Sequence, residues 1–336
     1  MKIYPFVFFV AAIAFFGCIR GTDTESQPEK VMPEAQYTLS KDQTHNKFSR
    51  LIPPVLTVES GAVIDAYTED ALDEQILPGM TTDDFNNLEY NPDLVHALTG
   101  PVYIEGAEPG DVLEVILHKI ECGSWGWTTV GLGGFLQDER FEPMLKTYTL
   151  SNDIKEIQFS DGITVPIEPF AGVMGVAPDT GEMLSTIPPG ANGGNMDDPD
   201  IVEGSKVYFP VFVKGALFSI GDLHAAQGAG EVCGTAIEMP GRVVYEVNVI
   251  KEGRKILEPQ YETQDTYAVT AIGVTLDEAA RKANSYMIDW LEEVQGMERN
   301  EAYMLTSLAA DLKIAEVVDQ NMLVTMHIPK SLFEKK

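Results

Sequence analysis

The densest group of chemically reactive side chains in the sequence lies in the segment GDLHAAQGAGE, residues 221–231. Asp222 and His224 are two residues apart, and side chains at that spacing lie on the same face of an extended strand. The glycines that follow allow the chain to turn and to return Glu231 to the same place. One imidazole and two carboxylates are a typical ligand set for a divalent cation that keeps a position open for water. The same spacing is also compatible with a polar turn between two strands.

A second group of polar side chains lies in the glycine-rich segment PGANGGNMDD, residues 189–198. Its glycines would let the backbone approach a ligand closely, and Asn195 and Asp197 could donate to it or accept from it. Taken alone, the segment also has the ordinary composition of a tight loop.

The remaining candidates are isolated polar residues beside predicted strands. His45, Asp70 and His96 are of this kind, whereas His118 and His327 lie inside strand patterns and are better explained as packed or surface histidines. The sequence contains neither a GxSxG nucleophile elbow nor a GxGxxG dinucleotide fingerprint, and it has no CxxC pair for a thiolate metal site.

The elements that must position these residues are short runs rich in Val, Ile and Tyr between Gly and Pro turns, clearest at residues 55–67, 100–121, 204–222 and 241–251. Such runs predict strands. Turn dipeptides recur between them, and they favour an antiparallel sandwich or barrel over a doubly wound parallel sheet. These dipeptides are Ser60-Gly61, Pro109-Gly110, Lys214-Gly215 and Pro240-Gly241.

The pattern changes after about residue 250, where α+β structure is expected. Residues 275–294 begin with Thr275 three positions before Glu278, which is the spacing of a capping box. Apolar residues then recur with the period of an amphipathic helix, at Ala279, Ala283, Met287 and Leu291. A second helical run covers 299–309, and LVTMHIP at 323–329 reads as a strand.

Composition limits the partners of the protein. The 336 residues are 44% hydrophobic, which is enough for a sizeable core. The 52 acidic and 23 basic residues give a net charge of −29, which would repel the phosphates of nucleic acid, so no nucleic-acid partner is expected. Three cysteines exclude a disulfide framework, although Cys122 and Cys233 could pair.

The N-terminus predicts export. Lys2 precedes an apolar run, residues 3–16, that is too short to span a bilayer, and the run ends at Gly17-Cys18. We therefore expect a lipoprotein-type signal at residues 1–18 with lipid on Cys18, a flexible tether at 19–40 and one folded body at 41–336. The protein would then lie in the periplasm or cell envelope, attached to a membrane by its lipid. A plain cleaved signal or an uncleaved anchor is the alternative.

Four blocks of sequence, spread between residues 45 and 333, resemble the acetamidase/formamidase family. They are LTGPVYIEGAEPGDVLEV, GGNMD, GDLHAAQGAGEVCGTAIE and NEAYMLTSLAADLKIAEVVDQN. The resemblance implies a mainly β fold, a jelly-roll-like antiparallel β-sandwich with additional α+β structure and C-terminal helices. It also implies hydrolysis of short linear amides to a carboxylic acid and ammonia, and a homo-oligomer.

The resemblance also marks site residues, which are His45, Asn46, Asp70, Asn195, Asp197, Asp222, His224 and Glu231. We expect a divalent metal ion, zinc or alternatively calcium, with ligands among Asp222, His224, His45 and Asp70. Glu231 would act as the general base, and Asn195 and Asp197 would complete the catalytic group. Asn195 would orient the amide through both its carbonyl oxygen and its NH₂ group.

The chain departs from the family pattern at two positions. Tyr67 occupies a place where many members carry Glu, and Asn192 stands where some members carry His. Glu69 could replace the missing carboxylate only with a shift of strand register. The departure at Tyr67 motivates an alternative function, a non-catalytic exported lipoprotein that binds a small ligand or a cation on the same fold.

Overall fold

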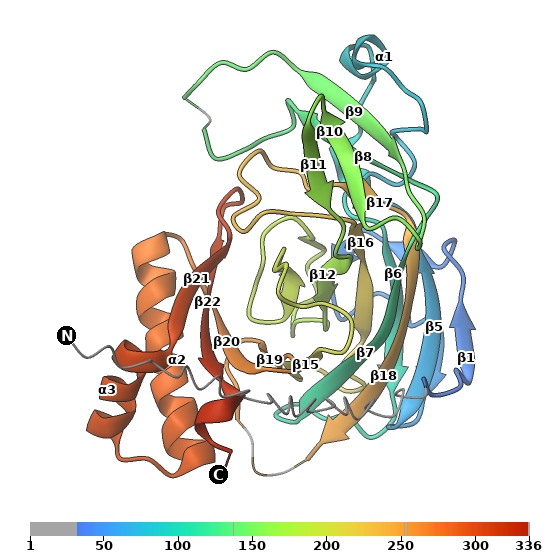
Figure 1. The fold of residues 1–336 in the computed structure, drawn as a ribbon. Coiled ribbons are helices and arrows are strands. Elements are labelled where there is room, and N and C mark those ends of the chain that lie inside the picture. The colour runs from blue at the N-terminus through green and yellow to red at the C-terminus, as the bar shows by residue number, and fades with distance from the viewer. Residues whose placement is uncertain (1–31, 137, 252, 254, 335–336) are drawn as a thin grey trace, which may run out of the picture. The chain divides into compact units, whose positions relative to one another are not determined.

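The computed structural model describes residues 32–136, 138–251, 253 and 255–334, and residues 33–336 form one compact unit. Two large sheets account for most of it (Figure 1). The first sheet has the strand order β1 (Tyr37–Leu39), β5 (Ala62–Thr68), β18 (Gly241–Ile250), β7 (Val112–Cys122), β15 (Lys206–Pro210), β19 (Gln260–Glu262), β20 (Thr266–Gly273), β22 (Met322–Pro329) and β21 (Asp311–Glu316).

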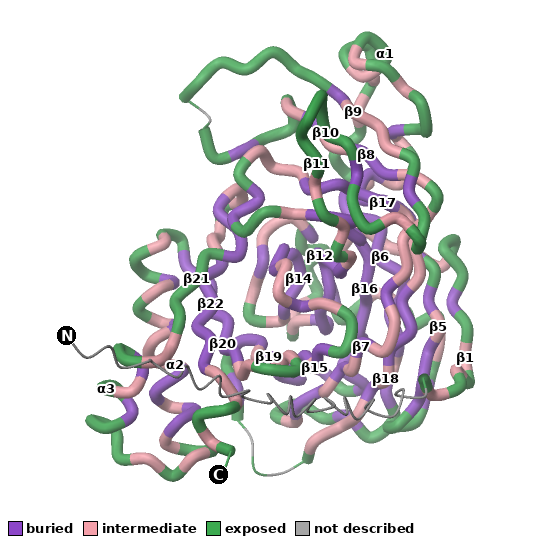
Figure 2. Tube along the Cα trace, viewed as in Figure 1, coloured by how far each residue is buried: buried purple, intermediate pink, exposed green. Residues whose placement is uncertain are grey.

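The second sheet carries the site residues. Its main order is β14 (Gly193–Asn195), β12 (Phe170–Gly175), β16 (Phe218–His224), β17 (Glu238–Met239), β8 (Trp125–Val130) and β9 (Met144–Thr149). β6 (Leu98–Ile104) also pairs with β16, and it is joined by β2 (Thr44–His45) and β4 (Leu56–Val58). Two small sheets remain, formed by β10 (Glu156–Ser160) with β11 (Ile163–Pro166) and by β3 (Lys47–Phe48) with β13 (Leu184–Ser185). The β10–β11 hairpin is largely exposed (Figure 2).

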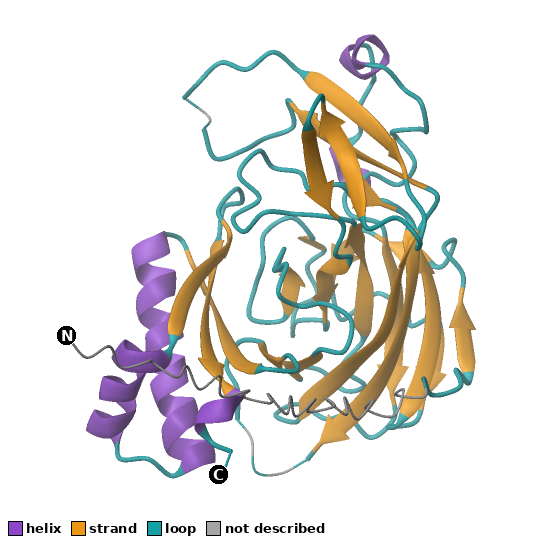
Figure 3. Cartoon of the chain, in the orientation of Figure 1, coloured by secondary structure: helices purple, strands orange, loops and turns teal. Residues whose placement is uncertain are grey.

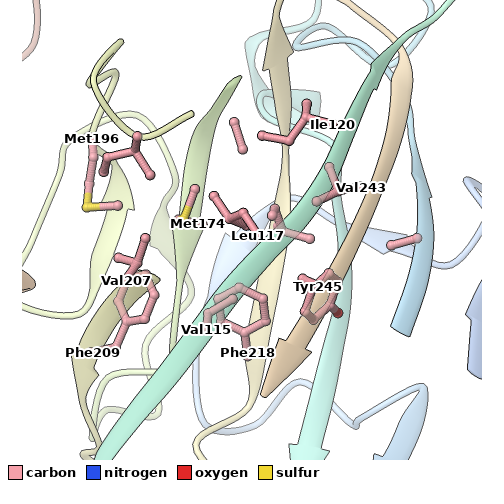
Figure 4. Packing of buried hydrophobic residues seen from close by; sticks show 14 of the residues in the cluster. Val115, Leu117, Ile120, Met174, Met196, Val207, Phe209, Phe218, Val243 and Tyr245 are labelled. Carbon is pink, nitrogen blue, oxygen red and sulfur yellow. The ribbon is translucent and has the colours of Figure 1, made fainter. Parts of the chain in front are cut away.

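The core lies between the two sheets. Figure 4 shows Leu117 of β7 and Tyr245 of β18 facing Met174 of β12 and Phe218 of β16. Phe218 and Tyr245 pack edge to face with ring centroids 5.4 Å apart. Burial of apolar surface from both sheets in one cluster is the main stabilising contribution of a β-sandwich.

The prediction of a mainly β, predominantly antiparallel fold with C-terminal helices is confirmed (Figure 3). Among the named strands of the described residues, only β1 with β5 and β4 with β6 pair in parallel. The short helices are α1 (Thr82–Asn86), η1 (Pro92–Leu94) and η2 (Lys330–Leu332).

The two C-terminal helices form where the local sequence predicts them. α2 spans Leu276–Gln295, and its N-cap Thr275 accepts from the backbone N–H of Glu278. The four apolar residues expected on one face are all buried, against β20 and β22. α3 spans Arg299–Ala309, as predicted. No helix among the described residues is long and apolar enough to cross a membrane.

The structure adds detail on the start of the folded body, on one predicted turn and on two cysteines. The folded body begins before residue 41, because β1 pairs with β5 from residue 37 onward; polar composition alone hid this short strand. Pro240-Gly241 is a strand junction and not a turn, since Gly241 starts β18 and a Cβ there would lie 2.6 Å from the carbonyl oxygen of Glu121. Cys122 and Cys233 are both free thiols. Residues 1–18, including Cys18, lie outside the described residues.

Candidate active site

A cavity of about 310 Å³ opens where β8, β14, β16 and β17 meet the turn between β21 and β22. This volume is at the lower end for ligand pockets and suits a small molecule. Apolar side chains such as Trp127 form part of its wall, and the polar part contains His96, Asn195, Asp197, Asp222, Glu231, Glu238 and Asp319. No lysine or arginine is among the lining residues in the described part of the chain.

His224 is the centre of the polar group. Its Nε2 lies 3.0 Å from Glu238 Oε2, 3.4 Å from Asp222 Oδ2 and 3.9 Å from Asp197 Oδ1. All four side chains are buried. Three carboxylates therefore surround one imidazole nitrogen inside the protein.

The other side of the His224 ring fixes which nitrogen faces the carboxylates. Gln227 donates through Nε2 to the carbonyl oxygen of Asp197 at 2.6 Å, which leaves its Oε1 to face His224 Nδ1 at 2.8 Å. Since Oε1 can only accept, Nδ1 carries the proton and donates. Nε2 consequently points at the carboxylate oxygens, with a proton in the charged ring or with its lone pair once a cation displaces that proton.

Several buried carboxylate oxygens of this group lack partners within the protein. Asp197 Oδ1 and Asp222 Oδ1 have no hydrogen-bond partner, and Glu238 Oε2 has none besides the nearby Nε2 of His224. Unpaired buried carboxylates are costly, and proteins pair them or use them to coordinate metals. Two sets of ligand atoms lie within 4.8 Å of one another, Asp222–His224–Glu238 and Asp197–His224–Glu231. The donor chemistry and spacing of both sets fit a divalent cation.

The acidic residues of the site are held by unusual backbone geometry. Asp197, Asp222 and Glu231 have φ of +42°, +52° and +46°. Positive φ is uncommon for residues other than glycine and is found preferentially at functional sites, where the surrounding fold holds the strain. Asp222 and His224 do converge as predicted. Because Asp222 does not have regular strand geometry, strand alternation alone does not explain their convergence.

Gly172 of β12 allows Asp197 and His224 to approach each other, because it has no side chain to occupy the space between them. A Cβ at this position would lie 2.5 Å from Asp197 Oδ1 and 2.7 Å from His224 Cε1. Both distances are too short for any side chain, so the cluster requires glycine here.

Burial and mutual charge together raise the pKa values of three members of the group. Burial raises the pKa of Glu238 to about 7 and raises that of Glu231 well above its usual range, with the charge of Asp197 adding to the second effect. Burial by itself lowers the pKa of His224, but the charges of Glu238 and Asp222 outweigh it and raise that pKa. Shifts of this kind cluster at functional sites.

The structure brings five of the predicted residues to this place: Asn195, Asp197, Asp222, His224 and Glu231. Asn195 differs from the expectation in one respect. Its Nδ2 donates one N–H to Asp319 Oδ2 at 2.9 Å, and its Oδ1, which has no partner, is available to a ligand.

His45 and Asp70 are not brought into either ligand set. The ring nitrogens of His45 contact Lys47 O and Ser219 Oγ, both at 2.7 Å. Asp70 accepts from the backbone N–H groups of residues 72 and 74 and from Trp127 Nε1 at 3.2 Å, so it orients a wall of the cavity. Each of the two side chains has protein partners in this structure, and the prediction that they are ligands stays a prediction.

Tyr67 and Asn192 do not affect the composition of the cavity. Tyr67 is 42% exposed and lies beside Arg242, whose Cζ is 6.0 Å from the ring centroid. Glu69 forms an ion pair with Lys41. Asn192 donates to the carbonyl oxygen of Val176 at 3.0 Å. Neither departure from the family pattern lines the cavity.

Sequence reasoning missed Glu238 and Asp319 and gave His96 no role. His96 Nε2 lies 3.8 Å from Asp222 Oδ2. Glu238 and Asp319 stand inside two of the family-like blocks, GTAIE and VVDQN, and their place in those blocks is the only signal that the sequence offers. They have no local pattern because β17 and the turn between β21 and β22 bring them from separate parts of the chain.

Comparison with known proteins agrees with this geometry. The sequence profile of the Acetamidase/Formamidase family matches residues 30–185 and 180–335. The chain is 29% identical over 346 residues to an acetamidase of Mycolicibacterium smegmatis, covering 76% of this chain and 82% of that protein. It is 28% identical over 370 residues to a formamidase of Methylophilus methylotrophus, covering 87% and 90%.

Solved structures give the same result. The crystal structure of a predicted acetamidase/formamidase from Thermoanaerobacter tengcongensis has a TM-score of 0.82 and 33% sequence identity, covering 88% of this chain and 96% of that chain. The profile match spans nearly the whole described body and includes every residue of the cavity. The chain therefore belongs to the Acetamidase/Formamidase family.

Proposed function

We propose that the protein hydrolyses the C–N bond of short linear amides to a carboxylic acid and ammonia in the 310 Å³ cavity. The acetamidase and formamidase names of its relatives support this reaction. The observation that carries the proposal is that Nε2 of His224 faces three buried carboxylates, with no lysine or arginine among the described lining residues.

The ligands that we propose for a divalent cation are Asp222, His224 and Glu238, because their facing atoms lie closest together. Zinc is the favoured ion, since imidazole with carboxylates suits zinc, whereas calcium prefers an all-oxygen set. When bound, such a cation makes a water molecule more acidic and polarises an amide carbonyl.

The residues outside this set carry the proton transfer and the binding. Glu231 lines the cavity and is positioned to accept a proton from the attacking water and to deliver it to the leaving nitrogen. Burial, followed by the charge of Asp197, raises the pKa of its carboxyl, which makes the carboxylate a stronger base. Trp127 and its apolar neighbours limit the size of the acyl group.

The direct test is ammonia release from formamide, acetamide and propionamide by the purified protein, before and after chelation and after return of zinc. We expect turnover that chelation removes and zinc restores. His224→Ala should lower both metal content and turnover by more than about 100-fold, because losing even an outer partner of a ligand costs 10–100-fold. His118→Ala is the matched control, since His118 pairs with Glu246 on the first sheet, away from the cavity.

The same assay separates the alternative function. A protein that binds zinc through His224 but releases no ammonia from any amide would be a binding protein and not an amidase. Full turnover after complete chelation would refute the cation and leave the amidase activity standing.

We also propose export with lipid on Cys18, supported by Lys2, the apolar run and Gly17-Cys18. Mass spectrometry of the mature N-terminus decides it, and recovery of unprocessed Met1 would refute it.

A homo-oligomer is proposed as well. Apolar side chains lie exposed on α3 and on the edge strand β21, namely Tyr303, Met304, Leu308, Leu312 and Ile314. If they form a subunit interface, Leu308→Asp should reduce the mass measured by light scattering.

A further inference from the structure

The Asn195 side chain is held at the wall of the cavity by one strong contact. Asn195 ends β14 and is 5% exposed, and its Nδ2 donates to Asp319 Oδ2 at 2.9 Å. Asp319 comes from the turn between β21 and β22, more than a hundred residues further along the chain. Both residues line the cavity.

The chemistry of a carboxylate fixes how the Asn195 amide is turned. An ionised carboxylate only accepts, so the NH₂ end of Asn195 must face Asp319. Its Oδ1 then points away from Asp319, and it is buried with no protein partner. The amide therefore presents Oδ1 to the cavity as a free acceptor, while one of the two N–H groups of Nδ2 is taken by Asp319.

Asp319 is itself held in place by the turn. Glu316 Oε1 accepts from the backbone N–H groups of Val318 and Asp319, at 2.6 and 2.7 Å. Glu316 is fully buried, so the turn that carries Asp319 is anchored inside the protein. An anchored carboxylate can impose one orientation on Asn195, whereas a mobile one could follow it.

We infer that Asp319 is a positioning residue that turns Asn195 Oδ1 toward the leaving group and thereby selects amides over esters. This inference rests on the proposed function. The NH₂ group of a primary amide can donate to Oδ1, but the alkoxy oxygen of an ester only accepts and would leave Oδ1 unpaired. A site built to hydrogen-bond one group discriminates against an analogue that lacks it, because its buried polar atom is then unsatisfied.

The test is the ratio of kcat/KM for acetamide to kcat/KM for methyl acetate, measured in the zinc-loaded full chain. Asp319→Asn gives Asn195 a partner that both donates and accepts, so its amide can turn either way. We expect the amide-to-ester ratio to fall about 10- to 100-fold, mainly through loss of amide turnover. Asp200→Asn, which alters a carboxylate paired with Lys313 outside the cavity, should leave the ratio unchanged.

A second variant guards against misfolding of the first. Asn195→Leu removes the acceptor at similar volume and should lower the same ratio. An unchanged ratio in Asp319→Asn, or an equal loss of amide and ester turnover in both variants, would overturn the inference. Failure of the proposed function would appear separately, as a wild type that releases no ammonia. Calorimetric binding of acetamide and methyl acetate to the same proteins would then decide the orientation of Asn195.

Discussion

Two groups of carboxylates in this protein have opposite surroundings. On the first sheet, Arg242 contacts Asp65 through two nitrogens, at 2.7 and 3.1 Å, and Glu121 through a third at 2.7 Å. In the cavity, the carboxylates around His224 are more deeply buried, yet no lysine or arginine of the described residues reaches them.

The difference in pairing and burial indicates a different role for each group of carboxylates. In the Arg242 network each carboxylate is paired with the guanidinium and is partly hydrated, so the network does not need a ligand from outside. The cavity group keeps unpaired oxygens where desolvation is most costly. A fold that retains such a group gives up stability for function, in agreement with our proposal that a cation binds there.

Glu231→Gln should have the largest effect among tests of this contrast. It keeps the size of the side chain and removes its ability to accept a proton, so kcat should fall by about 10²–10⁴-fold with metal content retained. Glu121→Gln makes the same change on the first sheet and should leave kcat unaltered. Loss of zinc from Glu231→Gln, measured by metal analysis, would instead make Glu231 a ligand.

Gly172→Ala probes the space in which the group assembles. The added Cβ would meet Asp197 and His224 at 2.5–2.7 Å, so these side chains must move apart. We expect zinc affinity, measured by competition with a chelating dye, to fall about 10–100-fold. Gly228→Ala is the matched control, since a Cβ there meets nothing within 4 Å. Unchanged affinity in Gly172→Ala would mean that the ion does not sit at His224.

Glu238→Gln should stabilise the protein when no metal is present. The pKa of Glu238 is raised by burial from 4.5 to about 7, so the metal-free wild type should lose stability as the pH rises through this range. Removing the ionisable group should recover up to about 3 kcal/mol at pH 8, since each pKa unit is worth about 1.4 kcal/mol. Urea unfolding with and without zinc measures this, and the order should reverse with zinc present. If Glu238→Gln is less stable than the wild type in chelator, the charges of the cavity carboxylates are already compensated within the metal-free protein.

Arg242→Met should have the smallest effect. It unpairs Asp65 and Glu121, but both carboxylates stay partly hydrated, so the free energy of unfolding should fall by about 1 kcal/mol or less. Amide turnover should not change. A loss of several kcal/mol in urea unfolding would contradict the contrast, since it would place the network among the costly buried groups.

The sequence by itself determined the local elements. α2 begins after Thr275 and buries the apolar face that its period predicts, because capping and periodicity act within a few residues. The strands follow their Val, Ile and Tyr runs for the same reason. Asp222, His224 and Glu231 could be grouped in advance because they lie within ten residues of one another.

Only the tertiary structure decided which further residues complete the site. Glu238, Asp319 and Gly172 reach His224 or its neighbours through strand pairing and turns that bring distant segments together. The contacts of His45 also depend on a distant part of the chain, since its Nε2 hydrogen-bonds with Ser219, 174 residues away. Side-chain type and spacing encode short-range geometry, whereas the positive φ of Asp197, Asp222 and Glu231 is imposed by packing of the whole fold.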